Sequence, residues 1–215
     1  MDFSVIEENL HLKIALQRLN RERNTNFTYL KPLQSVCIMQ TYERDVISAL
    51  KTGYGKSLIF ESLAYYKTGN TSPTIIIVSP LNAIINEQLE RNGENAIQVT
   101  PEFVKTLSDH KCSDKCDLSC SVNRFRTADI KFILGHPEHF MEKVVFNNFL
   151  TPVWQETVKY IVIDEAHCID KWGDSFRKEF GNLGRLRSLY PMAKSLALTG
   201  TATGVTAMNI KNISA

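Results

Sequence analysis

Lys51–Ser57 reads KTGYGKS and lies between a short apolar run and a helical pattern. Its two glycines allow the backbone to curl so that N–H groups face an anion, and the positive end of the following helix would face it too. Lys56 could then reach the β- and γ-phosphates of a nucleotide, and Ser57 could hold Mg²⁺. The full GxxxxGK[ST] pattern begins with glycine, and Leu50 stands at that position. The alternative to a phosphate-binding loop is therefore a glycine turn that only caps a helix.

Tyr160–His167 reads YIVIDEAH, an apolar strand that ends in two carboxylates. Consecutive side chains at a strand end point in different directions, so the two carboxylates can serve different partners. Asp164 is the candidate Mg²⁺ ligand, Glu165 the candidate base or water-orienting group, and His167 a further catalytic candidate. An ordinary polar strand end is the alternative, but the two motifs in this order are more specific than either one.

The elements that must position these residues alternate along the chain. Apolar runs predict strands at 45–50, 74–79, 129–134, 158–164 and 195–199, and the second, third and fourth of these runs are nearly continuous. Helical patterns lie at 56–66, 81–91, 138–144 and 176–189. This alternation predicts an α/β fold with a mostly parallel sheet, helices on both faces and ligands at the carboxyl ends of the strands. Residues 94–127 are predicted to form an irregular, Cys-containing insertion.

Composition indicates an ordinary globular protein. The chain has 215 residues, 43% hydrophobic and 22% charged, with a formal net charge of +2 that is too small to indicate a polyanionic partner. The N-terminus is not a signal peptide, and no apolar run approaches the ~18 residues of a membrane span. We therefore expect an intracellular protein. The compartment that we predict is the nucleus.

Several segments together resemble the first RecA-like lobe of RecQ-family helicases, with features of the Werner branch. KTGYGKS resembles helicase motif I, which accounts for Leu50, and SPLNAIINEQ, GHPEHF and LALTGTAT resemble later motifs. DEAHCIDKWGDSFRKEF (164–180) is the most characteristic match. The resemblance covers about 27–203 and implies a RecA-like P-loop lobe at 27–215, preceded by a helical segment at 1–26.

The resemblance implies a site for ATP and Mg²⁺. FTYLKPLQ would bind the base, with Gln34 at the adenine edge, Lys31 as a nearby polar contact and Phe27 stacked on the ring. An amide can donate and accept at once, as that edge requires. Phe27 as a core residue is the alternative. The nucleotide-binding loop would comprise Thr52, Gly53, Tyr54, Gly55, Lys56 and Ser57.

The resemblance also implies DNA contacts. Trp172 and Phe176 could stack on bases, and Lys171 and Arg177 could pair with phosphates. Ser79 and Thr201, in the motifs on either side, are the remaining candidates.

The chain departs from the family at two places. The family has Arg at Lys31, and it has His-Asp at Asp174 and Ser175. The second departure favours an alternative function, a non-catalytic DNA-binding or regulatory module. A DEAH-type RNA helicase is a further alternative, against which the CIDKWG segment weighs.

The activity implied is ATP-dependent 3′–5′ translocation on DNA and its unwinding, in DNA repair and recombination. A second RecA-like lobe would supply an arginine finger and half of the DNA track. We expect residues 1–215 to be a fragment that is inactive by itself.

A cluster of His110, Cys112, Cys116 and Cys120 has the chemistry of zinc ligands. Its spacing is not that of the common CxxC pairs, so we favour a thiol-rich surface loop, with zinc as the alternative.

Overall fold

A computed structural model of the chain describes residues 9–67, 72–109, 120–167 and 183–200. In these ranges six strands form one sheet in the order β1-β6-β5-β2-β4-β3. The strands are β1 (Val46–Ala49), β2 (Thr74–Val78), β3 (Ala96–Val99), β4 (Phe132–Gly135), β5 (Val158–Ile163) and β6 (Lys194–Thr199). All their pairings are parallel, which confirms the predicted α/β sheet.

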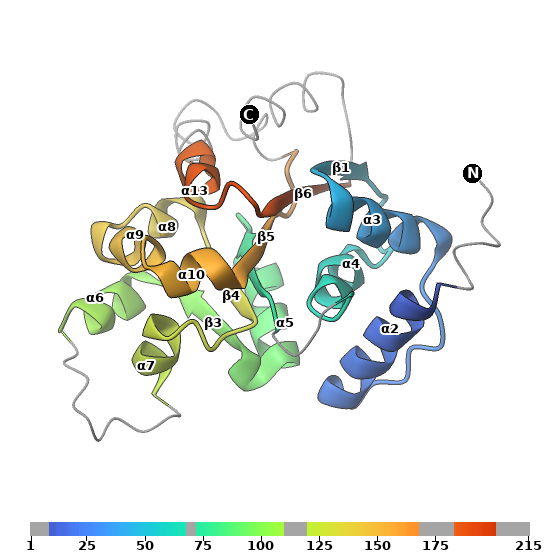
Figure 1. Cartoon of the computed structure of the whole chain (residues 1–215), viewed down its shortest axis with the longest axis horizontal. Helices are drawn as coiled ribbons and strands as arrows, with labels where there is room; N and C mark the ends of the chain where they lie inside the picture. The colour runs from blue at the N-terminus through green and yellow to red at the C-terminus, as the bar shows by residue number, and fades with distance from the viewer. Residues whose placement is uncertain (1–8, 68–71, 110–119, 168–182, 201–215) are drawn as a thin grey trace.

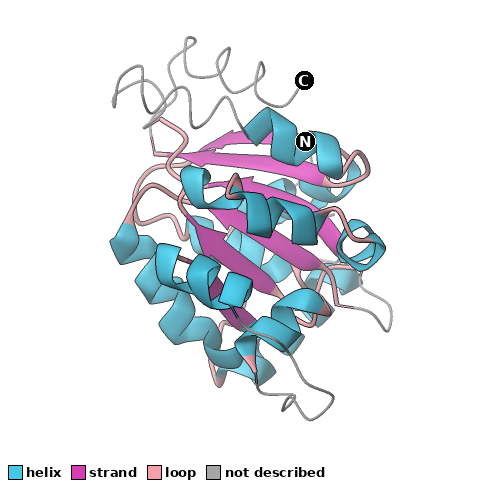
Figure 2. Cartoon of the chain, turned by 90° about the vertical axis from the view of Figure 1, so that its left-hand side faces the viewer, coloured by secondary structure: helices cyan, strands magenta, loops and turns pink. Residues whose placement is uncertain are grey.

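Helices cover both faces of the sheet (Figures 1 and 2). One face carries α2 (Leu10–Arg23), α3 (Pro32–Glu43), α4 (Lys56–Leu63) and α5 (Asn82–Asn92). The other carries α6 (Pro101–Asp109), α7 (Ser121–Arg126), α8 (Pro137–Phe140), α9 (Lys143–Phe149), α10 (Pro152–Thr157) and α13 (Leu183–Leu189). Strand β2 shows why both layers form: Ile75 and Ile77 enter one core, and Ile76 and Val78 enter the other.

Helix α2 is the helix predicted near the N-terminus. The Asn9 side chain accepts hydrogen bonds from the backbone N–H groups of His11 and Leu12 and so caps its first turn. Its apolar residues recur three and four positions apart and are buried in the core that also contains α3 and α4: Leu12, Ala15, Leu16 and Leu19. A division of the chain at residues 26 and 27 stays a prediction.

Residues 94–127 differ from the sequence-based prediction. They were predicted to be irregular, but the described part contains the 3₁₀ turn η1 (Gly93–Asn95), β3, α6 and α7. Strand β3 has only four residues, one of them Gln98, so its apolar run is too short to recognise by pattern. In α6, Phe103, Val104 and Leu107 pack against the core from one side of the helix, a periodicity that the prediction overlooked.

The region before β5 is also more divided than predicted. Instead of one helix at 138–144 there are two, α8 and α9, and α10 follows them. Of the helix predicted at 176–189, the structure describes the part in α13. None of the described helices has both the length and the apolar character needed to cross a membrane.

The parallel arrangement gathers the loops that follow the strands. Strands β1, β6 and β5 are neighbours, and their carboxyl ends pair as Ala49 with Thr199 and Ile163 with Ala197. The loop after β1 and the turn after β5 therefore emerge at the same edge of the sheet.

Candidate nucleotide-binding site

The loop that joins β1 to α4 has the backbone geometry of an anion-binding turn. Gly53 and Gly55 have φ angles of 79° and 86°, a left-handed conformation that favours glycine. Gly55 is the N-cap of α4, so the first turn of this helix directs its N–H groups and the positive end of its dipole towards the loop.

Gln34, on α3, holds this loop in place. Its amide nitrogen donates to the carbonyl oxygens of Tyr54 and Gly55, at 3.1 and 3.0 Å, and its oxygen accepts from the Lys31 N–H at 2.8 Å. The Lys31 ammonium donates to the Tyr54 carbonyl at 3.3 Å and lies 4.9 Å from the centre of the Tyr54 ring. Two of the three predicted base-binding residues, Lys31 and Gln34, therefore contact the phosphate loop directly. The Gln34 side chain is 2% exposed, and the backbone of the loop engages its amide.

We expect Gly55→Ala to disrupt the loop more than Gly53→Ala. A Cβ at Gly55 would lie 2.7 Å from Gln34 Nε2, whereas one at Gly53 would meet nothing within 4 Å. Both changes force an alanine into the left-handed region, which destabilises by about 1–2 kcal/mol. Only Gly55→Ala also displaces the Gln34 amide, which should raise its total effect to about 2–4 kcal/mol.

Urea unfolding of both variants would measure the difference. Calorimetric titration with ADP should also show weaker binding for Gly55→Ala. Equal destabilisation by the two alanines would remove the structural role given to Gln34.

The turn after β5 places the two carboxylates at the end of the phosphate loop. The backbone N–H of Asp164 donates to Val78 in β2, and that of Ala166 donates to Leu198 in β6, both at 2.9 Å. The turn is thus fixed to both neighbouring strands. Between these anchors Glu165 adopts a φ of 49°, which is uncommon for a residue with a side chain.

Lys56 and Glu165 form the central contact of the site. Lys56 Nζ donates to Glu165 Oε1 at 2.9 Å, and the two side chains are 11% and 14% exposed. The residues are 109 positions apart in the sequence. The fold therefore brings together the cation of the first motif and a carboxylate of the second.

Asp164 is buried beside this pair. Burial, and then the neighbouring Glu165 carboxylate, raise the pKa of Asp164 to about 6, while the Glu165 backbone N–H and Lys56 oppose the shift. A buried carboxylate with a raised pKa is stabilised by an added cation. Carboxylate and hydroxyl oxygens are ligands that Mg²⁺ accepts, so Asp164 and Ser57 fit this ion.

His167 extends the pair towards β6. Its Nδ1 lies 3.2 Å from Glu165 Oε2 and 3.3 Å from the Thr199 hydroxyl. A chain of polar contacts thus runs from Lys56 through Glu165 and His167 to the end of β6.

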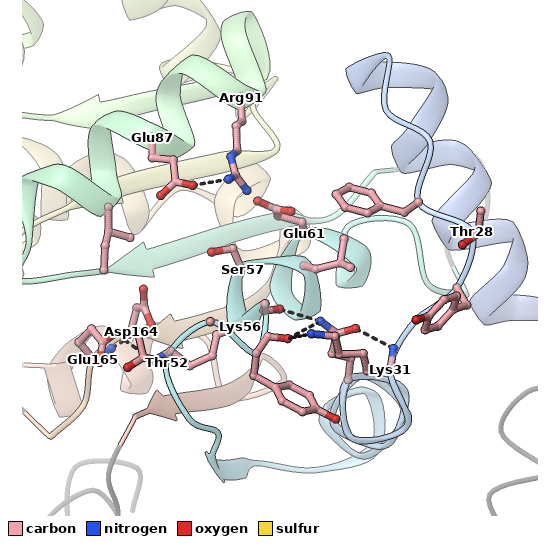
Figure 3. Close-up of a pocket in the computed structure, with 18 of the residues that line it drawn as sticks. Thr28, Lys31, Thr52, Lys56, Ser57, Glu61, Glu87, Arg91, Asp164 and Glu165 are labelled. Carbon is pink, nitrogen blue, oxygen red and sulfur yellow. Dashed lines mark hydrogen bonds and ion pairs between the residues drawn. The ribbon is translucent and has the colours of Figure 1, made fainter.

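The phosphate loop and the two carboxylates line one cavity of about 690 Å³, within the range of roughly 300–1,000 Å³ for small-molecule sites, whereas His167 is not part of its lining (Figure 3). Asp164, Glu165, Thr52 and Lys56 gather at one end, and Thr28 and Lys31 lie at the other. The sequence-predicted residues that the cavity brings together are Phe27, Lys31, Gln34, Thr52, Gly53, Tyr54, Gly55, Lys56, Ser57, Asp164 and Glu165.

The cavity also has walls that the sequence analysis missed. Glu61 follows Lys56 on α4, and Ile84, Glu87 and Arg91 line the cavity from α5. The α5 residues are three and four positions apart, so they share one helix face, and that spacing could have identified them. Asn26, Thr28, Tyr29 and Leu58 complete the lining.

The predicted DNA-binding residues are for the most part outside the described ranges. This applies to Lys171, Trp172, Phe176, Arg177 and Thr201, and to the departures at Asp174 and Ser175. Ser79 is described and fully buried, and its hydroxyl accepts from the Leu81 N–H at 3.4 Å. In this arrangement the Ser79 side chain is covered, and its contact with DNA stays a prediction.

The cysteine cluster is largely outside the described ranges as well. His110, Cys112 and Cys116 fall there, while Cys120 is half-buried against the core as the N-cap residue of α7. Among the described residues, no group of three or more His, Cys, Asp or Glu side chains could hold a metal ion.

Comparison with known proteins gives consistent matches. A family model of DEAD/DEAH box helicases matches residues 31–210. The chain is 30% identical to the ATP-dependent DNA helicase RecQ of Haemophilus influenzae over 176 residues, which are 79% of this chain and 26% of that protein. It is 32% identical to the ATP-dependent DNA helicase Q5 of Rattus norvegicus over 195 residues, 86% of this chain and 19% of that protein.

Among solved structures, the helicase domain of Hef from Pyrococcus furiosus superposes with a TM-score of 0.59 at 18% identity. The superposition covers 85% of this chain and 35% of the Hef chain. At this identity, the similarity is one of fold alone. The chain spans about a quarter or less of the length of the two curated relatives.

Proposed function

Because the chain belongs to the DEAD/DEAH box helicase family, we propose that it is the ATP-binding lobe of a RecQ-like DNA helicase. The observation that carries the proposal is the contact between Lys56 and Glu165 at the mouth of the phosphate loop, in a cavity large enough for a nucleotide. The two named relatives, both DNA helicases, favour DNA over RNA as the substrate.

The residues of the cavity divide the work on ATP. The N–H groups of the loop and the Lys56 ammonium hold the β- and γ-phosphates. Glu165 orients the attacking water and accepts its proton. Asp164 and Ser57 would hold Mg²⁺, which when bound neutralises charge on the phosphates. Phe27 and Lys31 would contact the base. Gln34 reaches the base only if its amide leaves the Tyr54 and Gly55 carbonyls, to which it donates in this structure.

Nucleotide binding must rearrange the central contact. Lys56 donates to Glu165 in the structure, and a phosphate would compete for the same ammonium. Transfer of Lys56 to phosphate would release Glu165 to bind water. The hydrolytic base would then become available only when nucleotide is present.

We propose that this lobe works with a second RecA-like lobe. That lobe would supply an arginine finger. Opening and closing of the cleft between the two lobes would drive 3′–5′ movement on DNA. Residues 1–215 alone would bind nucleotide and hydrolyse it slowly. We place the protein in the nucleus, in DNA repair and recombination.

The test is the ATPase rate of the full-length protein with single-stranded DNA, with single-stranded RNA and with neither. Stimulation by DNA alone supports the proposal. Stimulation by RNA alone would favour an RNA helicase, and nucleotide binding without hydrolysis in any condition would favour a regulatory module.

Lys56→Ala should weaken ATP binding. The loss of a charge-assisted hydrogen bond to phosphate removes about 1.5–3 kcal/mol, or roughly 10- to 100-fold in affinity. Calorimetric titration with ATP would measure this loss of affinity. Lys51→Ala is the control, because Lys51 is an exposed lysine of the same loop and is not among the residues that line the cavity. Unchanged affinity in Lys56→Ala would exclude the phosphate-binding role of this loop.

A further inference from the structure

Asn20, near the end of α2, holds the backbone of Phe27 at both of its polar groups. Its side-chain oxygen accepts from the Phe27 N–H at 3.0 Å, and its amide nitrogen donates to the Phe27 carbonyl at 2.8 Å. The same oxygen accepts from the Thr25 hydroxyl at 2.9 Å. The Asn20 amide thus holds residues 25–27, the segment that follows α2 and ends at the predicted base-stacking residue.

Phe27 lies where such a hold matters. It is 41% exposed, so packing alone does not immobilise it. It lines both the nucleotide cavity and a second cavity of about 410 Å³, whose lining comes from α2 and from the segment that leads into α3. Because Phe27 borders two cavities and is partly exposed, a fixed backbone limits the positions that its ring can take.

The segment around Phe27 has two anchors. After the left-handed Asn24 ends α2, residues 25–31 form neither helix nor strand before Pro32 begins α3. Gln34 accepts from the Lys31 N–H at the far end of this segment. Asn20 is the anchor of its near end.

The helix that carries Asn20 is itself fixed to the phosphate-binding helix, which lies beside it in Figure 1. Arg23 of α2 and Glu61 of α4 form an ion pair at 2.6 Å, and their side chains are 6% and 1% exposed. Arg23 also donates to Asn92 on α5 at 2.5 Å. Asn20 therefore positions Phe27 relative to the helix that begins at Lys56.

We propose that Asn20 is a positioning residue that sets the affinity of the cavity for the adenine end of a nucleotide by holding Phe27 in place. This inference rests on the proposed function. Asn20 acts through Phe27, so its removal should affect binding of the base and leave binding of phosphates alone.

The size of the effect follows from a population argument. Loss of the two hydrogen bonds to Phe27 is sufficient to lower the population of the binding-competent arrangement about tenfold. The apparent affinity for the nucleotide falls by the same factor. Asn20→Ala should therefore bind ADP about tenfold more weakly than the unaltered chain. Asn20→Asp, which keeps the acceptor but places a carboxylate oxygen against the Phe27 carbonyl, should also weaken ADP binding.

Calorimetry with two probes tests this. ADP reports on base and phosphates together, and inorganic tripolyphosphate reports on the phosphate loop alone. Asn20→Ala is expected to weaken ADP and to leave tripolyphosphate unchanged. Gln17→Ala, which removes an exposed amide one turn earlier on α2, is the matched control and should change neither.

Phe27→Ala separates this inference from the proposed function. If Phe27→Ala weakens ADP and Asn20→Ala does not, the inference is wrong and the base site stands. Equal weakening of ADP and tripolyphosphate in Asn20→Ala would also overturn it, because that result indicates a general structural role. If the unaltered chain binds ADP no more tightly than tripolyphosphate, the base contributes nothing to affinity. Both the base site and the inference then fail.

Discussion

Glu165→Gln should keep ATP binding and lose ATP hydrolysis. Glutamine cannot accept the proton of the attacking water, and the loss of a general base slows a reaction by roughly 10²–10⁴-fold. Asp164 and Ser57 remain in place to hold Mg²⁺. Calorimetry for binding and a coupled assay for DNA-stimulated hydrolysis in the full-length protein would measure the two effects separately.

Binding in this variant should be as tight as before, or tighter. Glu165 accepts from Lys56 in the structure and so competes with phosphate for that ammonium. A neutral amide competes less well, because the charge-assisted hydrogen bond is the stronger one. Parallel loss of binding and turnover would show that the roles of Asp164 and Glu165 are exchanged or wrong.

Glu156→Gln provides the control for this experiment. Glu156 is an exposed carboxylate in α10, just before β5 begins, whereas Glu165 follows the end of that strand. Its change should leave both binding and hydrolysis unaltered. A similar loss in the control would indicate that the assay responds to net charge rather than to the base.

Glu61→Ala should have the largest effect on stability. The change leaves Arg23, whose side chain is 6% exposed, as an uncompensated charge between α2 and α4. Breaking a buried ion pair from one side lowers the free energy of unfolding by about 3–5 kcal/mol. Urea unfolding followed by circular dichroism would measure the loss.

Two further variants test the cause. Arg23→Met combined with Glu61→Leu removes both charges, and it should be far less destabilising than Glu61→Ala because no buried charge remains. Arg91→Ala breaks the exposed Glu87–Arg91 pair of the same cavity wall, which should change stability by about 0.5 kcal/mol or less. If the double variant is as unstable as Glu61→Ala, lost packing rather than charge explains the effect.

The parts of the fold that sequence could predict are those with strong local patterns. The apolar run of β2 is buried along its whole length, and such a run is recognisable without any knowledge of its neighbours. The glycine spacing before Lys56 and the two acids after β5 likewise report local chemistry. Their contact was predictable because parallel strands end at one edge of a sheet.

The parts that sequence could not predict depend on pairs that are distant in the chain. Nothing in the letters around Arg23 indicates Glu61 as its partner, and nothing around Asn20 indicates that its amide binds Phe27. Such contacts follow from tertiary packing and have no period of their own. Strand β3 was missed for a related reason, since four residues carry too little pattern to outweigh polar surroundings.

The backbone of Glu165 implies a conflict between two kinds of selection. Its φ of 49° lies in a region that glycine enters without penalty and that asparagine and aspartate tolerate better than glutamate. A saturation library at this position, ranked by folding alone, should therefore place glycine or asparagine above the native residue. The same library ranked by ATP turnover should keep glutamate alone, and the gap between the two rankings would measure how much stability catalysis sacrifices at this turn.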